Sequence, residues 1–285
     1  MKTHFLISTA LGALVLTLVT LFFDLIFGRD VTANYLGWMF FSNLLISFVL
    51  GIIIKTNTYS GWKLTVFLFL IYFVIGHFNL LIEAYIFSVT DRDQTLLIIL
   101  QGFLITLLSS PMLVYVFGRW QGKVSRVELV PRSGFSWLWR TLVGDLLYVF
   151  LYLLAGFVLY SVYPQLMDFY KDKVPPFSVM ITTQFFRAAL FILIAVLISR
   201  NTRLSLWHRG LLIGLFFAVV GGLASLIVPE NEVMPDYIRF GHAFEVGISN
   251  FLFGLILTFL MGQKTVTEDE SEKAEPKNEN ELNLI

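Results

Sequence analysis

The sequence predicts an all-α integral membrane protein, a polytopic bundle of eight transmembrane helices with both termini in the cytoplasm. Hydrophobic residues make up 57% of the chain and charged residues only 14%, against roughly 45–50% and 25% in soluble domains. The apolar residues are gathered in long runs, and about 20 helical residues are enough to cross a hydrocarbon core. Lysine and arginine are concentrated in the loops of one side, which is the side expected in the cytoplasm.

The long apolar runs number eight, and a helix pairs every backbone polar group of such a run within its own segment. Short stretches rich in Gly, Pro, Asn and Asp separate the runs, as expected of turns. Residues 1–263 are therefore predicted to form one transmembrane helical domain. The predicted spans cover about residues 5–27, 34–55, 63–88, 95–117, 138–163, 177–199, 207–228 and 240–262.

Turn residues and charges mark the ends of these spans. The first span begins after Lys2, and its apolar run exceeds the usual 7–15 residues of a signal-peptide core, so we expect a retained helix. Spans one to four are connected on the outer side by Gly28-Arg29-Asp30 and Asp91-Arg92-Asp93. Spans five to eight are connected on that side by segments that contain Pro175-Pro176 and Pro229.

Residues 264–285 differ in composition from the rest of the chain, because they are rich in Glu, Lys, Asn and Asp and poor in apolar side chains. Such segments bury too little apolar surface to fold, so we expect a disordered, charged cytoplasmic tail. The expected location is the cell (plasma or inner) membrane, and the first expected partner is the lipid bilayer. A net charge of zero gives no sign of nucleic-acid binding.

Five of the ionisable residues inside the apolar runs direct the prediction of a site, because a charge costs about 2.5–3.5 kcal/mol at the bilayer centre. Such residues usually face the interior of the protein and often mark function. The five are Asp24, Glu83, Arg187, His242 and Glu245. Depths estimated from the helical rise place Arg187 near the midplane and the other four in the outer half of the bilayer.

Helical periodicity groups these residues on common faces, because residues three, four or seven apart lie on one side of a helix. The last span has one polar stripe, and Asn250 lies in the same span near the midplane. The stripe consists of Arg239, His242, Glu245 and Ser249. These residues predict a polar pocket in the outer half of the bundle.

The third span contributes Asn79 and Glu83 on a shared face. His77 lies about 120° away at 100° per residue. It can join the same pocket only if other helices surround this span or if Gly76 permits a kink.

Histidine beside carboxylates predicts a divalent metal such as Zn²⁺, because a His/carboxylate pair three residues apart can present both groups to one ion. The predicted metal ligands are His77, Glu83 and His242. Glu245 is the predicted general base on metal-bound water, and Arg187 is predicted to stabilise an oxyanion or bind a phosphate. The remaining predicted pocket residues are Asp24, Arg239, Asn79, Ser249 and Asn250. The protein would then be a membrane-embedded enzyme acting on a lipid or a membrane peptide.

Known catalytic motifs do not narrow this prediction. The chain contains no HExxH, GxSxG, Walker or GxGxxG sequence, so the common zinc-protease, hydrolase and nucleotide-binding patterns are not indicated. It also has no cysteine, which excludes disulfides, iron–sulfur clusters and a cysteine nucleophile.

Two alternatives remain open. In a proton- or cation-coupled transporter of a small-molecule ligand, Glu83, Glu245 and Asp24 would bind the cation and Arg187 would be the internal counter-ion. The sequence offers little support, because no internal repeat is visible and Pro111 and Gly221-Gly222 are the only plausible hinges. In a non-catalytic assembly or partner protein, Arg187 would pair with one of three carboxylates only to hold helices in register. The three possible partners are Glu83, Glu245 and Asp24.

Overall fold

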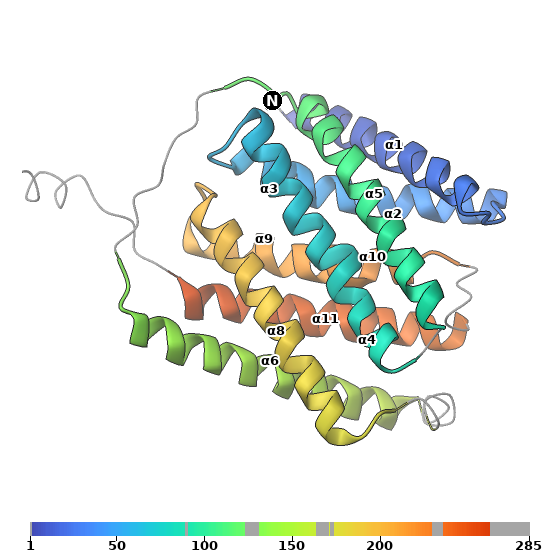
Figure 1. Ribbon diagram of the computed structural model, residues 1–285. Coiled ribbons are helices and arrows are strands. Elements are labelled where there is room, and N and C mark those ends of the chain that lie inside the picture. The colour runs from blue at the N-terminus through green and yellow to red at the C-terminus, as the bar shows by residue number, and fades with distance from the viewer. Residues whose placement is uncertain are drawn as a thin grey trace, which may run out of the picture.

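The structure is a computed structural model that describes residues 2–88, 91–122, 131–163, 171, 174–229 and 236–262. Within these residues it contains eight helices that are long and apolar enough to cross a membrane, and no strand (Figure 1). The predicted helical, multi-span fold class is therefore confirmed. The cytoplasmic placement of both termini stays a prediction, and the expected tail at 264–285 lies outside the described residues.

The observed spans begin and end close to the predicted boundaries. The third span consists of α3, the π-helical segment η1 and α4, and the seventh consists of α9, the π-helical segment η2 and α10. The elements are α1 (Lys2–Ile26), α2 (Ala33–Thr56), α3 (Gly61–Phe73), η1 (Val74–Phe78), α4 (Asn79–Ile86), α5 (Arg92–Val116), α6 (Gly134–Val162), α8 (Phe177–Arg200), α9 (Leu206–Ala218), η2 (Val219–Leu223), α10 (Ala224–Leu226) and α11 (Asp236–Met261).

Several helix ends are satisfied by nearby side chains, which pair backbone groups that a helix leaves unpaired at its termini. Thr32 accepts a hydrogen bond from the backbone N–H of Tyr35 at the start of α2. At the end of α11, Arg140 donates to the carbonyl of Leu260, and Arg132 donates to the carbonyl of Gly262. Cations are favourable there, because the C-terminus of a helix has a partial negative charge.

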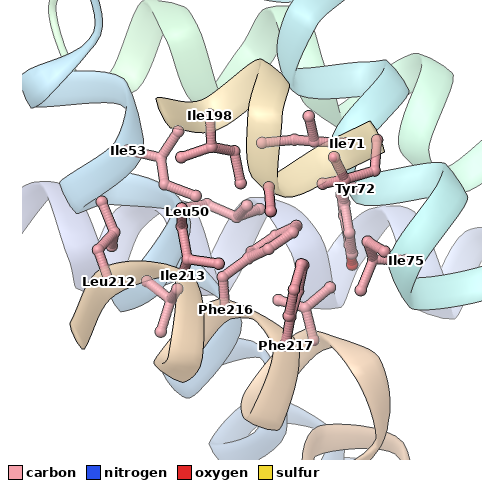
Figure 2. Packing of buried hydrophobic residues seen from close by; sticks show 14 of the residues in the cluster. Leu50, Ile53, Ile71, Tyr72, Ile75, Ile198, Leu212, Ile213, Phe216 and Phe217 are labelled. Atoms are coloured by element: carbon pink, nitrogen blue, oxygen red, sulfur yellow. The ribbon is translucent and has the colours of Figure 1, made fainter. Parts of the chain in front are cut away.

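The main apolar core lies between spans two, three, six and seven (Figure 2). Leu50 of α2 meets Ile71 of α3, Ile198 of α8 and Phe216 of α9 in one buried cluster. The outward faces of the helices also hold large apolar side chains, such as Phe157, as expected of a surface against lipid. The core is therefore built where the first four spans meet the last four.

The last four spans repeat the first four, although no repeat is evident from the embedded polar residues. Helices α3 and α9 are each 13 residues long, and each is followed by a five-residue π-helical segment. The segments that lead into them share Asn-Thr and then Ser-x-Trp. They read Asn57-Thr58-Tyr59-Ser60-Gly61-Trp62 and Asn201-Thr202-Arg203-Leu204-Ser205-Leu206-Trp207.

The packing follows the same repeat. Helix α1 packs against α2 and α5, and α5 packs against α3; correspondingly, α6 packs against α8 and α11, and α11 packs against α9. Between the halves, η1 contacts η2, α2 contacts the seventh span, and α8 contacts η1 and α4 of the third span. We call residues 2–122 the N-terminal half and residues 131–262 the C-terminal half.

Contacts between the halves are reciprocal, as in a two-fold symmetric interface. A Cβ atom placed on Gly76 would lie 3.1 Å from Val220, and one placed on Gly221 would lie 3.3 Å from Ile75. Gly76 and Gly221 are both the third residue of a π-helical segment. Because each half has four spans, corresponding helices run in the same direction, as in transporters with parallel repeats.

The same reciprocity holds in the two connecting segments, which pair in an isolated antiparallel bridge. The backbone N–H of Thr58 donates to the Asn201 carbonyl at 2.8 Å, and the N–H of Arg203 donates to the Thr56 carbonyl at 3.1 Å. The pseudo-two-fold axis therefore runs from this bridge to the contact between η1 and η2. The repeat is therefore evident in the packing of the helices, although it is not visible in the embedded polar residues of the sequence.

Candidate functional site

An ion pair between Glu83 of α4 and Arg187 of α8 joins the two halves of the molecule. The Tyr152 hydroxyl of α6 donates to Glu83 Oε1 at 2.9 Å, and Arg187 Nη1 also donates to Gln184 Oε1 at 3.0 Å. The Arg187 side chain is 7% exposed and that of Glu83 is 26% exposed. We call Glu83, Tyr152, Gln184 and Arg187 the ion-pair cluster.

The helix interruption in the third span contributes to the position of Glu83. A π-helical turn contains more residues than an α-helical turn, so it rotates the residues that follow it relative to those that precede it. Helix α4 begins directly after η1, and its Asn79 and Glu83 are one turn apart on the same face. Because α4 packs against α8, Glu83 can meet Arg187.

His242 and Glu245 of α11 form a second pair beside the ion-pair cluster. His242 Nδ1 lies 2.8 Å from Glu245 Oε2, which is an ion-pair contact when the imidazole is protonated. Helix α11 packs against α8, and α8 packs against α4. Predicted site residues from spans three, six and eight therefore lie on helices that contact one another.

Asp24 belongs to a different cluster, which lies within the N-terminal half. Its Oδ2 accepts from the Tyr35 hydroxyl at 2.9 Å, and its Oδ1 accepts from Gln101 Nε2 at 2.7 Å. Arg29 Nη1 lies 3.9 Å from Asp24 and donates to the Tyr35 hydroxyl. This Asp24 cluster ties α1, α2 and α5 together, and its contacts do not involve Glu83.

His77 also faces away from the ion-pair cluster. Its ring packs on α5, where a Cβ atom added to Gly102 would lie 2.3 Å from the ring, and it contacts the Tyr72 ring at a centroid distance of 5.5 Å. The helix is distorted at Gly76, as joining the pocket would require, but the distortion leaves His77 beside α5. Within the described chain, no group of three or more His, Asp or Glu residues lies close enough to hold a metal ion. The three predicted metal ligands are therefore not brought together.

Three further predicted pocket residues contact the backbone. Arg239 is buried and donates from Nη1 to a carbonyl of α10 at 2.7 Å. Ser249 donates to a carbonyl one turn earlier in its own helix at 3.3 Å. Asn250 donates to the Gly221 carbonyl of η2 at 3.3 Å. Asn250 thereby satisfies a backbone group at the helix interruption, as buried polar groups inside a membrane require.

Asn79 differs from these residues. It is fully buried, and neither its amide nitrogen nor its amide oxygen has a hydrogen-bond partner among the residues that the structure describes. It therefore remains a residue with unused hydrogen-bonding capacity next to Glu83.

Tyr152 and Gln184 have larger roles than the sequence indicates. Tyr152 follows Tyr148 by one turn, and the Arg187 guanidinium lies 5.9 Å from the centre of the Tyr148 ring. Gln184 precedes Arg187 by three residues on the same helix face. The available signal was this spacing of polar and aromatic groups along otherwise apolar helices.

Comparison with known protein families, with curated proteins and with solved structures finds no match to this chain. The molecule is thus a polytopic helical bundle with the composition of a membrane protein. Its two four-span halves meet at paired helix interruptions, and an ion pair between the buried Arg187 and the half-buried Glu83 joins them.

Proposed function

We propose that the protein is a transporter that moves a small polar solute through the interface between its two halves. The observation that carries this proposal is the pair of helix interruptions, η1 and η2, at equivalent positions of the two halves and in contact with each other. In transporters built from repeats, the binding site lies near the midplane at the repeat interface and is formed by interrupted helices.

The interruptions provide a place where one half can move relative to the other. Gly222 leaves helical geometry, with φ 166° and ψ −53°. Small residues border the contact on both sides, because Gly76 faces Val220 and Gly221 faces Ile75. Rocking of the halves about this contact would give a central site access to each side of the membrane in turn.

The ion-pair cluster links such movement to ligand binding. Glu83 belongs to the N-terminal half, whereas Tyr152, Gln184 and Arg187 belong to the C-terminal half. A solute that contacts these groups would therefore bind the arrangements of the two halves with different affinities. Differential affinity is the physical requirement for a ligand-driven conformational change.

The enzyme and assembly alternatives have less support. A metal-dependent enzyme would need His77 beside Glu83 and His242, and His77 packs on α5 instead. A purely structural ion pair fits the contacts of Arg187, but it does not account for two facing helix interruptions at equivalent positions of a repeat.

The absence of cysteine from the chain allows a direct test by single-cysteine labelling. Thr183 is buried on α8, one turn before Arg187 on the same face. Thr183→Cys should react with a membrane-impermeant maleimide added to either side, in right-side-out and in inside-out vesicles. Leu193→Cys, on the exposed apolar face of α8, is the control and should not react, because lipid covers it.

Each outcome of this labelling bears on the proposal. Reaction from both sides supports alternating access. Reaction from one side only contradicts it and favours an enzyme site open to one leaflet. Absence of reaction from both sides, in a folded variant, contradicts it and favours a structural role for the cluster.

A further inference from the structure

We propose that Asn79, together with Arg187 and Glu83, forms the surface that contacts the transported solute, and that this solute is uncharged and has both a hydrogen-bond donor and an acceptor. This inference rests on the proposed transporter function and deepens it. It starts from the one fully buried amide in the site whose two polar atoms are both unpaired, that of Asn79.

An unpaired buried amide costs roughly 1–3 kcal/mol, so one in a folded protein calls for an explanation. Every other buried amide of the described chain has at least one paired polar atom; Asn57, for example, leaves its nitrogen unpaired but accepts from the Tyr59 N–H through Oδ1. Asn43 donates to the Thr17 hydroxyl at 3.1 Å, and Asn250 donates to carbonyls at the second helix interruption. The environment of Asn79 is therefore exceptional within the described molecule.

The two helix interruptions differ at equivalent positions. Asn79 is the first residue after η1, and Ala224 is the first residue after η2. The Ala224 carbonyl accepts from Ser42 at 2.6 Å, and the Gly222 carbonyl accepts from Ser225 at 2.8 Å. Serine hydroxyls thus satisfy backbone carbonyls at the second interruption. The first interruption is followed by Asn79, whose side chain has no hydrogen-bond partner in the described chain.

A second unused donor lies on α8, a helix against which α4 packs. The buried Nε of Arg187 has no hydrogen-bond partner in the described part of the chain, although the Nη1 atom of the same residue pairs with Glu83 and Gln184. Asn79 and Glu83 are one turn apart on the same face of α4, and α4 packs against α8. A solute at this face would meet an amide donor, an amide acceptor and a guanidinium donor.

The charges of the site select against an ionic solute. The Glu83 carboxylate and the Arg187 guanidinium compensate each other within the surface proposed to contact the solute. A solute with a net charge would add an uncompensated charge to an apolar environment, which is strongly unfavourable. A neutral solute avoids this penalty and can still satisfy the Asn79 amide.

The stability of ligand-free protein gives the first test. Replacing Asn79 by leucine, an apolar side chain of similar shape, removes an unpaired polar group, so Asn79→Leu should leave the thermal midpoint in detergent unchanged or raise it. Asn43→Leu is the matched control and should lower the midpoint, because it removes a paired amide. A midpoint for Asn79→Leu that falls as far as that of Asn43→Leu would overturn the inference.

Solute entry into proteoliposomes gives the second test. The probes are acetamide, acetate and acetamidinium, which are planar and similar in size but neutral, anionic and cationic. Swelling followed by light scattering should show faster acetamide entry than in protein-free liposomes, and no acceleration for either ion. The increment should be lost in Asn79→Leu and kept in Asn43→Leu.

The possible failures are distinguishable. Three results would overturn the inference. The protein could speed the entry of the ions as much as that of acetamide, it could fail to speed acetamide entry, or Asn79→Leu could still speed acetamide entry. Labelling of Thr183→Cys from both sides would still support a transporter in each of these cases. Labelling from one side only would contradict transport itself, whatever the solute.

Discussion

The two halves of this molecule share a backbone plan and differ in how they use buried polar groups. Asn43 and Arg187 are each the eleventh residue of a 24-residue helix, in α2 and α8 respectively. Asn43 pairs with Thr17 inside its own half, whereas Arg187 reaches Glu83 in the other half. The same position in the repeat thus holds a local structural contact in one half and a contact between halves in the other.

A second pair of positions shows the same difference. Gln101 and Glu245 are each the tenth residue of the last span of their half, in α5 and α11. Gln101 donates a hydrogen bond to Asp24, while Glu245 lies beside His242 on a helix that packs against α8. The two halves therefore share their apolar packing. The polar groups of the candidate site come mainly from the C-terminal half, and Glu83 is the one that comes from the N-terminal half.

The largest expected effect comes from removing one member of the ion pair that joins the halves. Glu83→Leu leaves the Arg187 guanidinium buried without its carboxylate, and breaking a buried pair in this way costs about 3–5 kcal/mol. Unfolding of the detergent-purified variant, followed by circular dichroism in increasing SDS, measures the loss.

The double variant Glu83→Leu/Arg187→Leu is the control for this experiment. It removes both charges, so it should recover most of the lost stability. A loss below about 1 kcal/mol for Glu83→Leu, which is the size expected of an exposed pair, would show that water solvates the pair and that it does not hold the halves together.

A smaller effect is expected in the Asp24 cluster of the N-terminal half. Gln101→Leu removes one hydrogen bond to a buried carboxylate, and bonds to charged groups contribute about 1.5–3 kcal/mol. The Tyr35 bond to Asp24 remains, so the loss should be less than that of Glu83→Leu in the same unfolding experiment. Gln101→Leu should also leave two-sided labelling of Thr183→Cys unchanged, because its contacts stay within one half. A loss of labelling would contradict the separation of the two clusters.

The sequence was sufficient for the spans, because the length of an apolar run and the residues that end it decide whether a helix can cross a membrane. It was also sufficient to identify Glu83 as one of three possible partners of Arg187. It could not choose among them, because depth along a helix says nothing about which helices are neighbours. Asp24 illustrates this limit: its depth matched that of Glu83, but it lies in a separate cluster with Tyr35 and Gln101.

The repeat was missed for a related reason, although Gly76 and Gly221-Gly222 were identified as possible points of helix distortion. The polar residues inside the apolar runs differ between the two halves, so they do not reveal the repeat. The shared signals lie elsewhere, in the Asn-Thr and Ser-x-Trp connections and in the equivalent Gly76 and Gly221. A π-helical turn changes the 3.6-residue spacing of polar and apolar side chains along a helix. A helix that is apolar on every side has no such pattern, so the turn cannot be recognised in its sequence.

The smallest expected effect concerns the contact between the interrupted span and the last span of each half. In both halves a small residue faces a larger side chain, but the helix that contributes the small residue differs. His77 and Gly222 are each the fourth residue of a π-helical segment. His77 faces Gly102 and Gly222 faces Val246, and these two partners are each the eleventh residue of the next span. A Cβ atom added to Gly102 or to Gly222 would lie 2.3 Å from His77 or Val246, respectively. Gly102→Ala and Gly222→Ala should therefore each destabilise the protein by about 1–3 kcal/mol through overpacking.

Rescue should follow the pairing across each interface. His77→Ala should restore much of the stability of Gly102→Ala, and Val246→Ala should do so for Gly222→Ala, because each makes room for the added methyl group. The exchanged combinations, Gly102→Ala with Val246→Ala and Gly222→Ala with His77→Ala, should be additive, since the two sites share no side chain. Rescue by the exchanged combinations would contradict two separate packing sites. Rescue within each pair would show that His77 fills space against α5, in the place that Val246 occupies in the other half.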